Sequence, residues 1–448
     1  MALWQMIQAK QVFETRRLDA EHFRPDYTRS EYLVNKVGAK PLGQLASYIK
    51  RGVQPSYSEE GKIPVLRTVN IREIALSDNR QEWVTTNFFQ SNPRGQVYQH
   101  DILITSTGVG TLGRVAYNYE STPYFADGHI TIVRDIRGIE PLFVATFLQS
   151  KIGLALIERR QRGSSGQIEI YPSDIAAIPI PLLQRTFQTE IAHQSQQSRN
   201  LIQSSKGLYD QAEQLLLHIL GLDQLEISTK TAYTAMFGEA VAANRLDAEY
   251  FQPKYRTIIE HLSHNFHADQ IGQWGSVLKG RSVKYLDFGT GIPVIRSGDL
   301  TDLDHANDLK QAAPNQVFFP LQKGDICISS IGFGSIGKVQ VFDNEGVYTT
   351  VSEVTVVRQK RVNPYYLQIF LQSVAGQQQI ERWITGATGQ LHLYPSHVKC
   401  IVVPILSTEL QTEIERLVME SRKAKREATQ LLEVAKQRVE QMILGEAQ

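Results

Sequence analysis

The chain has 448 residues, of which 42% are hydrophobic and 21% charged, and its formal net charge is +1. This apolar content suffices for about two or three globular cores, which excludes a disordered or fibrous protein. No stretch approaches the roughly 20 apolar residues of a membrane-spanning helix, and the N-terminal segment lacks the pattern of a secretory signal. We therefore expect a soluble multidomain protein that stays in the cytoplasm.

Two further properties of the composition restrict the function. Cys327 and Cys400 lie far apart with no metal-ligand pattern around them, which excludes a disulfide framework and a paired-cysteine zinc site; we expect both in cores. A protein that holds DNA alone by phosphate contacts is often basic, so the near-neutral charge counts mildly against solitary DNA binding. It leaves open local basic loops and partner proteins that hold the DNA backbone.

The sequence contains one module twice. Three pairs of segments match in the same order, beginning at Arg17 and Arg245 (RLDAEHFRPDY, RLDAEYFQPKY), at Ile63 and Ile292 (IPVLRTVNI, IPVIRSGDL), and at Asp101 and Asp325 (DILITSTGVGTLGRV, DICISSIGFGSIGKV). Residues 140–182 and 363–405 align without a gap, with 17 of 43 positions identical. A repeat of this extent defines two domains of the same fold.

Each copy combines short strands with a late helix. Apolar, β-branched runs bounded by Gly, Pro and Asn predict strands at IPVL, DILI and ITIV in the first copy and at IPVI, DICI and VTVV in the second. Residues 142–160 and 366–383 are typical of helices. Because the strands come first and the helix late, we predict the α+β class rather than a doubly wound sheet.

Basic residues occur at related places in the two copies. They are Lys50, Arg51 and Arg67 in the first copy and Lys279, Arg281, Lys284 and Arg296 in the second. Arg67 and Arg296 each end a strand, which makes them the stronger candidates for contact with nucleic acid. A solvated surface charge is the alternative for every member of the set.

A GxGxxG motif follows the strand at Ile102 and recurs in the second copy, with glycines at 108, 110 and 113 and at 332, 334 and 337. A dinucleotide site would need a helix next, but RVAYNY and KVQVF alternate like strands. We interpret the motif as a glycine-rich connection between two strands. Its flanking hydroxyl and basic groups suit phosphate or base-edge contacts: Ser106, Thr107 and Arg114 in one copy and Ser329, Ser330 and Lys338 in the other.

A second candidate lies between the late helix and the last strand, where RQRGSSGQIEIYPS from Arg160 recurs as WITGATGQLHLYPS from Trp383. Gln can pair with adenine and Arg with guanine, each worth about 1 to 3 kcal/mol of discrimination. The candidates are Arg160, Arg162, Ser164, Ser165 and Gln167, and Thr385, Thr388 and Gln390. The scaffold is kept while its ends differ, as two readers of different sequences require. An ordinary hairpin is the alternative, and we expect the Tyr-Pro pairs at 171–172 and 394–395 simply to pack.

A long helix is predicted after each copy, over 183–221 and 406–448. Residues alternating at spacings of three and four form a seam in the same register in both, and a 3.5-residue repeat over about four heptads favours a coiled coil. The apolar seam residues are Ile191, Leu201, Leu208, Leu215, Ile219, Ile414, Leu417, Leu431 and Met442. The alternative, that each helix lies on its own domain, is favoured by polar seam residues such as Gln194, Ser198 and Arg438.

No motif predicts catalysis. Asn363-Pro364-Tyr365-Tyr366 is similar to the NPPY loop of amino-methyltransferases, but the second proline is absent and no glycine-rich turn for S-adenosylmethionine accompanies it. The 11 histidines include no HExxH pair and no triad. We predict a chain without catalytic residues and without a metal or cofactor of its own.

The order of domain, long helix, domain, long helix resembles the specificity subunit of type I restriction-modification systems. The resemblance rests on RLDAEYFQPKY at a domain start, the GDICISSIGFGSIGKV hairpin and the GSSGQ and GATGQ turns, and it covers nearly the whole chain. It implies that each domain reads one half of a bipartite DNA site. It also implies that the two helices pair antiparallel as a ruler; 34 residues from Gln188 to Gly221 give about 50 Å, more than one DNA turn.

The same resemblance implies double-stranded DNA, two methyltransferase subunits and restriction or translocase subunits as partners. Those subunits would bring S-adenosylmethionine, magnesium and ATP. The predicted parts are a first target-recognition domain (1–182), a central helix (183–221), a linker (222–244), a second target-recognition domain (245–405) and a distal helix (406–448). A recognition module of another restriction-modification class, a DNA enzyme, and a coiled-coil adaptor that does not bind DNA remain as alternatives.

Overall fold

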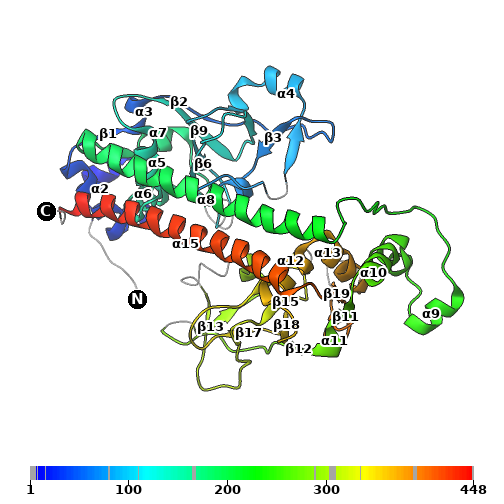
Figure 1. Ribbon diagram of the computed structural model, residues 1–448. Helices are drawn as coiled ribbons and strands as arrows, with labels where there is room; N and C mark the ends of the chain where they lie inside the picture. The colour runs from blue at the N-terminus through cyan, green and yellow to red at the C-terminus, as the bar shows by residue number, and fades with distance from the viewer. Residues whose placement is uncertain are drawn as a thin grey trace. The chain divides into compact units, whose positions relative to one another are not determined.

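The computed structural model describes residues 7, 9–15, 17–78, 81–108, 110–163, 168–286, 289–301, 309–332, 334–386 and 391–445. The chain forms two compact units, residues 1–204 with 424–448 and residues 205–423. Both boundaries cut through the two long helices, α8 (Arg185–Ile219) and α15 (Thr408–Leu444), which Figure 1 shows in green and red. Each unit therefore contains part of each long helix. The five-part division predicted from the sequence stays a prediction.

The first unit is built on two four-stranded sheets. The central sheet is antiparallel, with the order β2 (Ala46–Arg51), β9 (Ile130–Ile136), β6 (Ile102–Thr105) and β7 (Val115–Tyr117). The second has the order β4 (Glu82–Val84), β3 (Ile63–Leu66), β8 (Tyr124–Ala126) and β5 (Gln96–Val97), and β3 and β8 are parallel. A further pair joins β1 (Ala39–Pro41) to β10 (Pro179–Pro181). The helices are α1 (Ala9–Thr15), α2 (Pro25–Lys36), α3 (Leu42–Leu45), α4 (Thr86–Ser91), α5 (Pro141–Gln149), α6 (Lys151–Glu158) and α7 (Pro172–Ala176).

The second unit repeats this plan. Its central sheet has the order β12 (Gly275–Lys279), β18 (Val354–Gln359), β15 (Ile326–Ser329) and β16 (Val339–Val341), and its second sheet joins β14 (Gln311–Ala312), β13 (Ile292–Ile295) and β17 (Thr349–Thr350). β11 (Ala268–Gln270) pairs with β19 (Val402–Pro404). The helices are α9 (Phe237–Ala243), α10 (Pro253–Asn265), α11 (Ile271–Trp274), α12 (Pro364–Gln372), α13 (Val374–Trp383) and α14 (Pro395–Val398). The predicted strands and the α+β class are confirmed.

The predicted late helix is two helices in each unit. In the first, α5 and α6 meet at a bend of 76° at Ser150, whose side chain accepts a hydrogen bond from the Gly153 backbone N–H. Ser373 starts α13 in the same way. A Cβ on Gly153 would lie 2.0 Å from the Phe147 carbonyl oxygen, so this close approach requires glycine. Among the described helices no single one is long and apolar enough to cross a membrane, although the bent pair α5 and α6 together meets that criterion of length and composition.

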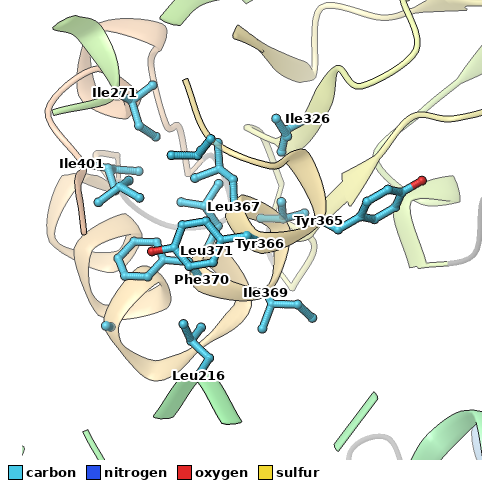
Figure 2. Packing of buried hydrophobic residues seen from close by; sticks show 14 of the residues in the cluster. Leu216, Ile271, Ile326, Tyr365, Tyr366, Leu367, Ile369, Phe370, Leu371 and Ile401 are labelled. Atoms are coloured by element: carbon cyan, nitrogen blue, oxygen red, sulfur yellow. The ribbon is translucent and has the colours of Figure 1, made fainter. Parts of the chain in front are cut away.

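The long helices contribute to the core of each unit. Ile191 of α8 and Val439 of α15 lie in the same apolar cluster as Phe143 of α5. In the second unit, Leu216 of α8 and Ile414 of α15 belong to the cluster that contains α12. Figure 2 shows Leu216 beside the aromatic and aliphatic side chains of that helix. The domains and the helices therefore share their hydrophobic cores.

The two helices also contact each other within each unit. In the first, Ser198 Oγ donates to the Ala428 carbonyl oxygen (2.8 Å), and Arg438 donates to Gln194 Oε1 (3.0 Å). Residue numbers rise along α8 as they fall along α15, so the segments run antiparallel. In the second unit, Ser421 Oγ donates to the Ser205 carbonyl oxygen (2.7 Å). Each helix thus packs both on the other helix and on a domain, while a coiled coil along their whole length stays a prediction.

The predicted seam needs correction at alternate positions. Ile191, Ile414 and Leu417 are buried as predicted, but six others are only half-buried: Leu201, Leu208, Leu215, Ile219, Leu431 and Met442. The buried residues that lie one position later are Leu216, Leu220, Leu432 and Ile443. The reason is that the buried face of each helix also turns toward a domain core, whereas the sequence pattern was fitted to a helix pair alone.

Matching polar contacts join each domain to the start of its helix. The Gln188 side chain accepts from the Glu140 backbone N–H (3.0 Å) and donates to the Leu183 carbonyl oxygen (2.7 Å). Gln411 repeats both contacts, with the Asn363 N–H (2.7 Å) and the Leu406 carbonyl oxygen (2.8 Å). Because all four partners are backbone groups, these two glutamines hold the domain whatever side chains surround them.

Two sequence features have structural explanations. Asn363 caps α12, because its Oδ1 accepts from the Tyr365 and Tyr366 backbone N–H groups (2.9 and 3.3 Å). The Tyr366 hydroxyl donates to the buried Pro404 carbonyl oxygen (2.5 Å), so the NPYY sequence starts a core helix. The predicted linker, 222–244, includes α9, and its Lys230 backbone exchanges two hydrogen bonds with the Gln252 side chain (3.2 and 3.0 Å).

A buried ion pair occupies the same place in each central sheet. Arg134 on β9 contacts the Asp101 carboxylate through Nε and Nη2 (2.7 and 2.6 Å), and Arg358 on β18 contacts Asp325 (2.8 and 2.7 Å). Both aspartates are 1% exposed. Burial raises the pKa of Asp101 despite its arginine. The pairs attach the loops before β6 and β15 to the neighbouring strands.

Replacing Arg358 with leucine leaves the Asp325 carboxylate buried without its cation. We expect the free energy of unfolding to fall by about 3 to 5 kcal/mol, measured by urea unfolding. Arg361→Leu is the control, because Arg361 is half exposed and lies 3.8 Å from Asp269, and such a pair contributes about 1 kcal/mol or less. Equal losses in the two variants would contradict the prediction.

Candidate nucleic-acid interface

The two loop candidates of each copy lie together. In the first unit, Thr107 of the glycine-rich connection and Arg162 of the turn after α6 each form a backbone bridge with Glu169. In the second, Ile331 and Thr385 form the same bridges with His392. We call the described residues of each pair of bridged segments the recognition edge of its domain: residues 106–108, 110–114, 160–163 and 168–171 in the first, and residues 330–332, 334–338, 383–386 and 391–394 in the second. From the sequence, the two loops of each copy were separate candidates, whereas in the structure backbone bridges join them.

The glycines of the connection make a tight turn between antiparallel strands. β6 pairs with β7, and β15 with β16, on either side of it. Gly108 and Gly113 have φ values of +101° and +82°, and Gly332 and Gly337 have values of +113° and +84°. Positive φ values favour glycine, because glycine lacks a Cβ. The interpretation as a strand connection is confirmed.

Ion pairs and hydrogen bonds order the first recognition edge. Arg51, at the end of β2, donates from Nη2 to Glu169 Oε2 (3.0 Å) and to the Ile170 carbonyl oxygen (2.9 Å). Arg162 makes two contacts with Asp174 (2.9 and 2.7 Å), which raise the pKa of its guanidinium. Thr107 Oγ1 lies 2.7 Å from His129 Nδ1. Donors and acceptors therefore stand at fixed positions on this edge.

The second recognition edge carries other chemistry on the same backbone. His392 stacks on Tyr394, with ring centroids 5.8 Å apart and planes 10° apart. Glu353 stands where the first copy has His129, and the backbone groups of both accept from the serine N–H at the same place (2.8 and 2.7 Å). Lys279 and Arg281 are exposed at and just after the end of β12, where Lys279 pairs with Thr355, the hydrogen-bond partner of Ser330 in this edge. The two domains thus present different groups at equivalent positions.

Four predicted contact residues are buried and cannot reach a ligand. Ser106 hydrogen-bonds Thr131 Oγ1 (2.5 Å), and Ser330 hydrogen-bonds Thr355 Oγ1 (2.5 Å), both inside the central sheet. Ser329 is buried, as is Arg160, which donates to Glu31 Oε1 (2.7 Å) and to the carbonyl oxygens of residues 156 and 177 (both 3.0 Å). Burial lowers the pKa of Arg160 to about 10, so it stays charged at neutral pH. These predictions were wrong because hydroxyl and guanidinium groups can also be satisfied internally.

The remaining candidates differ in accessibility. Arg296 is paired with Asp299 (3.0 Å from both Nε and Nη2), and Arg67 lies 3.7 Å from Glu82. Arg114, Lys338 and Thr385 are half-buried, and Arg114 donates to the Gly110 carbonyl oxygen (3.0 Å). Ser164, Ser165, Gln167, Thr388 and Gln390 lie outside the described residues.

Sequence reasoning missed Glu169, His392, Tyr171 and Tyr394. The two tyrosines, expected to pack, are 41% and 46% exposed, and Tyr171 donates a hydrogen bond to Glu169. The signal was available: Glu169 and His392 align in the repeat and differ in type, as Arg160 and Trp383 do. A change of side-chain type between the two copies is therefore an equally strong indication of a candidate contact residue at every aligned position of the turn.

The possible metal ligands and the two cysteines have the following places in the described part of the chain. No group of three His, Cys, Asp or Glu side chains is placed there to hold a metal ion. Cys327 is buried in β15, where burial raises the pKa of its thiol, and Cys400 is half-buried. The expectation of a core position is confirmed for Cys327 and holds in part for Cys400.

The second domain matches a known family. Residues 270–418 match the family model described as type I restriction modification DNA specificity domain. None of the curated proteins is significantly similar to the chain.

Three solved structures are similar over most of their length. The S subunit of a type I restriction-modification system from M. genitalium is 16% identical with a TM-score of 0.43, covering 90% of this chain and 95% of that one. The HsdS subunit from Thermoanaerobacter tengcongensis is 13% identical with a TM-score of 0.29, covering 91% and 97%. A structure described by complex assembly and conformational transition of the type I R-M system is 14% identical with a TM-score of 0.30, covering 91% and 96%.

The second domain, with its bridged recognition edge, is a DNA specificity domain of the type I restriction-modification class. The first domain repeats its sheets, its broken helix and its edge. For residues 270–418, this match bears out the resemblance to type I restriction-modification specificity subunits that was drawn from the sequence.

Arg281 offers a test of the edge in the second domain. Because an exposed cation beside it would neutralise a DNA phosphate, we expect Arg281→Ala to reduce the slope of log affinity against log salt by about 0.9. Arg361→Ala is the control, because it removes the same charge at a distant place. Arg361 follows the end of β18 that is opposite to the end near Arg281. Affinity should be measured by titration at several salt concentrations. An equal change in both variants would argue against a local contact.

Proposed function

We propose that this chain reads a bipartite DNA site, one half with each domain, and directs methylation and restriction by partner subunits. The observation that carries the proposal is the duplicated recognition edge, which keeps its backbone bridges while Glu169 is replaced by His392 and His129 by Glu353. Glu accepts from cytosine and other polar groups pair with other base edges, so different groups on equal scaffolds suit different half-sites.

The partners follow from the class and from the duplication. Two methyltransferase subunits would bind the repeated scaffold, and restriction or translocase subunits would join them. S-adenosylmethionine, magnesium and ATP would be bound by those subunits, and this chain would contribute no catalytic group. The complex would act in the cytoplasm. Its near-neutral charge is consistent with partners that hold the DNA backbone.

Mapping the methylated bases in DNA from cells that carry this chain and its methyltransferase tests the proposal. We expect two short specified blocks separated by an unspecified spacer. Cells with the methyltransferase alone are the control and should show no such site. An adaptor without DNA binding would leave methylation unchanged, and a single continuous recognition sequence would contradict reading by two domains.

The ruler role of the helices has a separate test. Removing residues 200–206 from α8 and 423–429 from α15 takes one heptad from each helix and about 10 Å from its length. At 3.4 Å per base pair, we expect the preferred spacer to shorten by about three base pairs with both half-sites unchanged. The methylation map measures both properties. Altered half-sites with the original spacer would refute the ruler.

A further inference from the structure

The RLDAE segment at the start of each domain contains an arginine held by its own aspartate. Arg17 contacts Asp19 through Nε and Nη2 (both 2.6 Å), and Arg245 contacts Asp247 in the same way (2.8 and 2.6 Å). Each arginine lowers the pKa of its aspartate. The Arg17 side chain is 10% exposed and that of Arg245 14%. Such a two-point contact fixes the plane of the guanidinium.

The oriented guanidinium reaches across the domain to the recognition edge. Arg17 Nη2 donates to the Gln161 carbonyl oxygen (2.7 Å), and Arg245 Nη2 donates to the Ile384 carbonyl oxygen (3.1 Å). Gln161 and Ile384 directly precede the residues that bridge to Glu169 and His392, which are Arg162 and Thr385. The contact therefore holds the backbone of the edge one residue before its bridge to Glu169 or His392.

Other residues near the start of each domain contact the end of the helix that precedes the turn, which is α6 in the first unit and α13 in the second. The His22 ring nitrogen Nδ1 lies 2.7 Å from the Arg159 carbonyl oxygen, just after α6. In the second unit, Tyr250 packs edge-on against Trp383, the last residue of α13, with centroids 5.2 Å apart. The domain start therefore contacts the end of this helix as well as the turn that follows it.

We infer that Arg17 and Arg245 are positioning residues, each of which sets the geometry of the recognition edge in its own domain without choosing the bases read. The inference rests on the proposed function. Both arginines act on backbone carbonyl groups, so their role is independent of the side chains Gln161 and Ile384, which differ. A lysine could keep the charge but not the planar two-point contact with the aspartate.

The test uses the complex with the methyltransferase and three forms of the chain: wild type, Arg17→Met and Arg245→Met. Losing a hydrogen bond to a charged group should reduce discrimination at one half-site about tenfold or more, measured as relative methylation of single-mismatch sites. The two variants should affect opposite half-sites, and each serves as the control for the other. Unchanged discrimination, or equal loss at both half-sites in each variant, overturns the inference.

Two further measurements separate positioning from general stability. Thermal unfolding identifies a variant that fails to fold; Asp19→Asn and Asp247→Asn then replace it, because they keep the arginine and weaken only its orientation. Loss confined to one half-site supports the inference for these variants, and unchanged discrimination overturns it. Arg17→Lys should restore discrimination only in part. A wild-type complex that methylates no bipartite site overturns the proposed function itself, which is a different result from unaltered variants.

Discussion

Side chains from both long helices complete the hydrophobic core of each domain, and the rest of the structure depends on this sharing. Ile191 and Val439, from different helices, lie in one core with Phe143, and Leu216 and Ile414 lie in the other. Burial of apolar surface contributes about 25 cal/mol per Å², so removing a helix from either core would cost several kcal/mol per large side chain. The domains are therefore not independent of the long helices, because both helices contribute side chains to each core. Each unit is a domain together with a segment of both helices.

The sequence was sufficient for the repeat, the strands and the α+β class, because runs such as IPVL and DICI carry a strong local signal. It was insufficient where a segment is compatible with two different local structures. Ser150 is compatible with a continuous helix, yet its side chain caps Gly153 and starts a second helix. The seam of the long helices was displaced for a related reason. Periodicity shows that a face is apolar, but it does not show how much of that face meets a domain instead of the other helix.

Predicting the site was harder, since polar residue types alone do not distinguish contact with a ligand from contact within the protein. Ser106 and Ser330 hydrogen-bond threonines on the adjacent strand, and Arg160 donates hydrogen bonds to Glu31 and to two backbone carbonyl oxygens. Conversely, Glu169 carries no motif and became visible only through the backbone bridges that converge on it. The exposure of individual side chains in these loops depends on tertiary contacts between residues as far apart in the chain as 25 positions for Ser106 and Thr131 and 129 positions for Arg160 and Glu31.

The glutamine contacts at the helix starts have a consequence for how such chains can diversify. Gln188 and Gln411 bind backbone N–H and carbonyl groups, which both domains of this chain present at the same place. A gene segment encoding one domain could therefore replace the other without a new set of complementary side chains at this joint. The shared cores set the limit of such an exchange, because the apolar residues facing the helices must travel with it. Contacts with the main chain at the joint therefore leave the side chains of each domain free to differ.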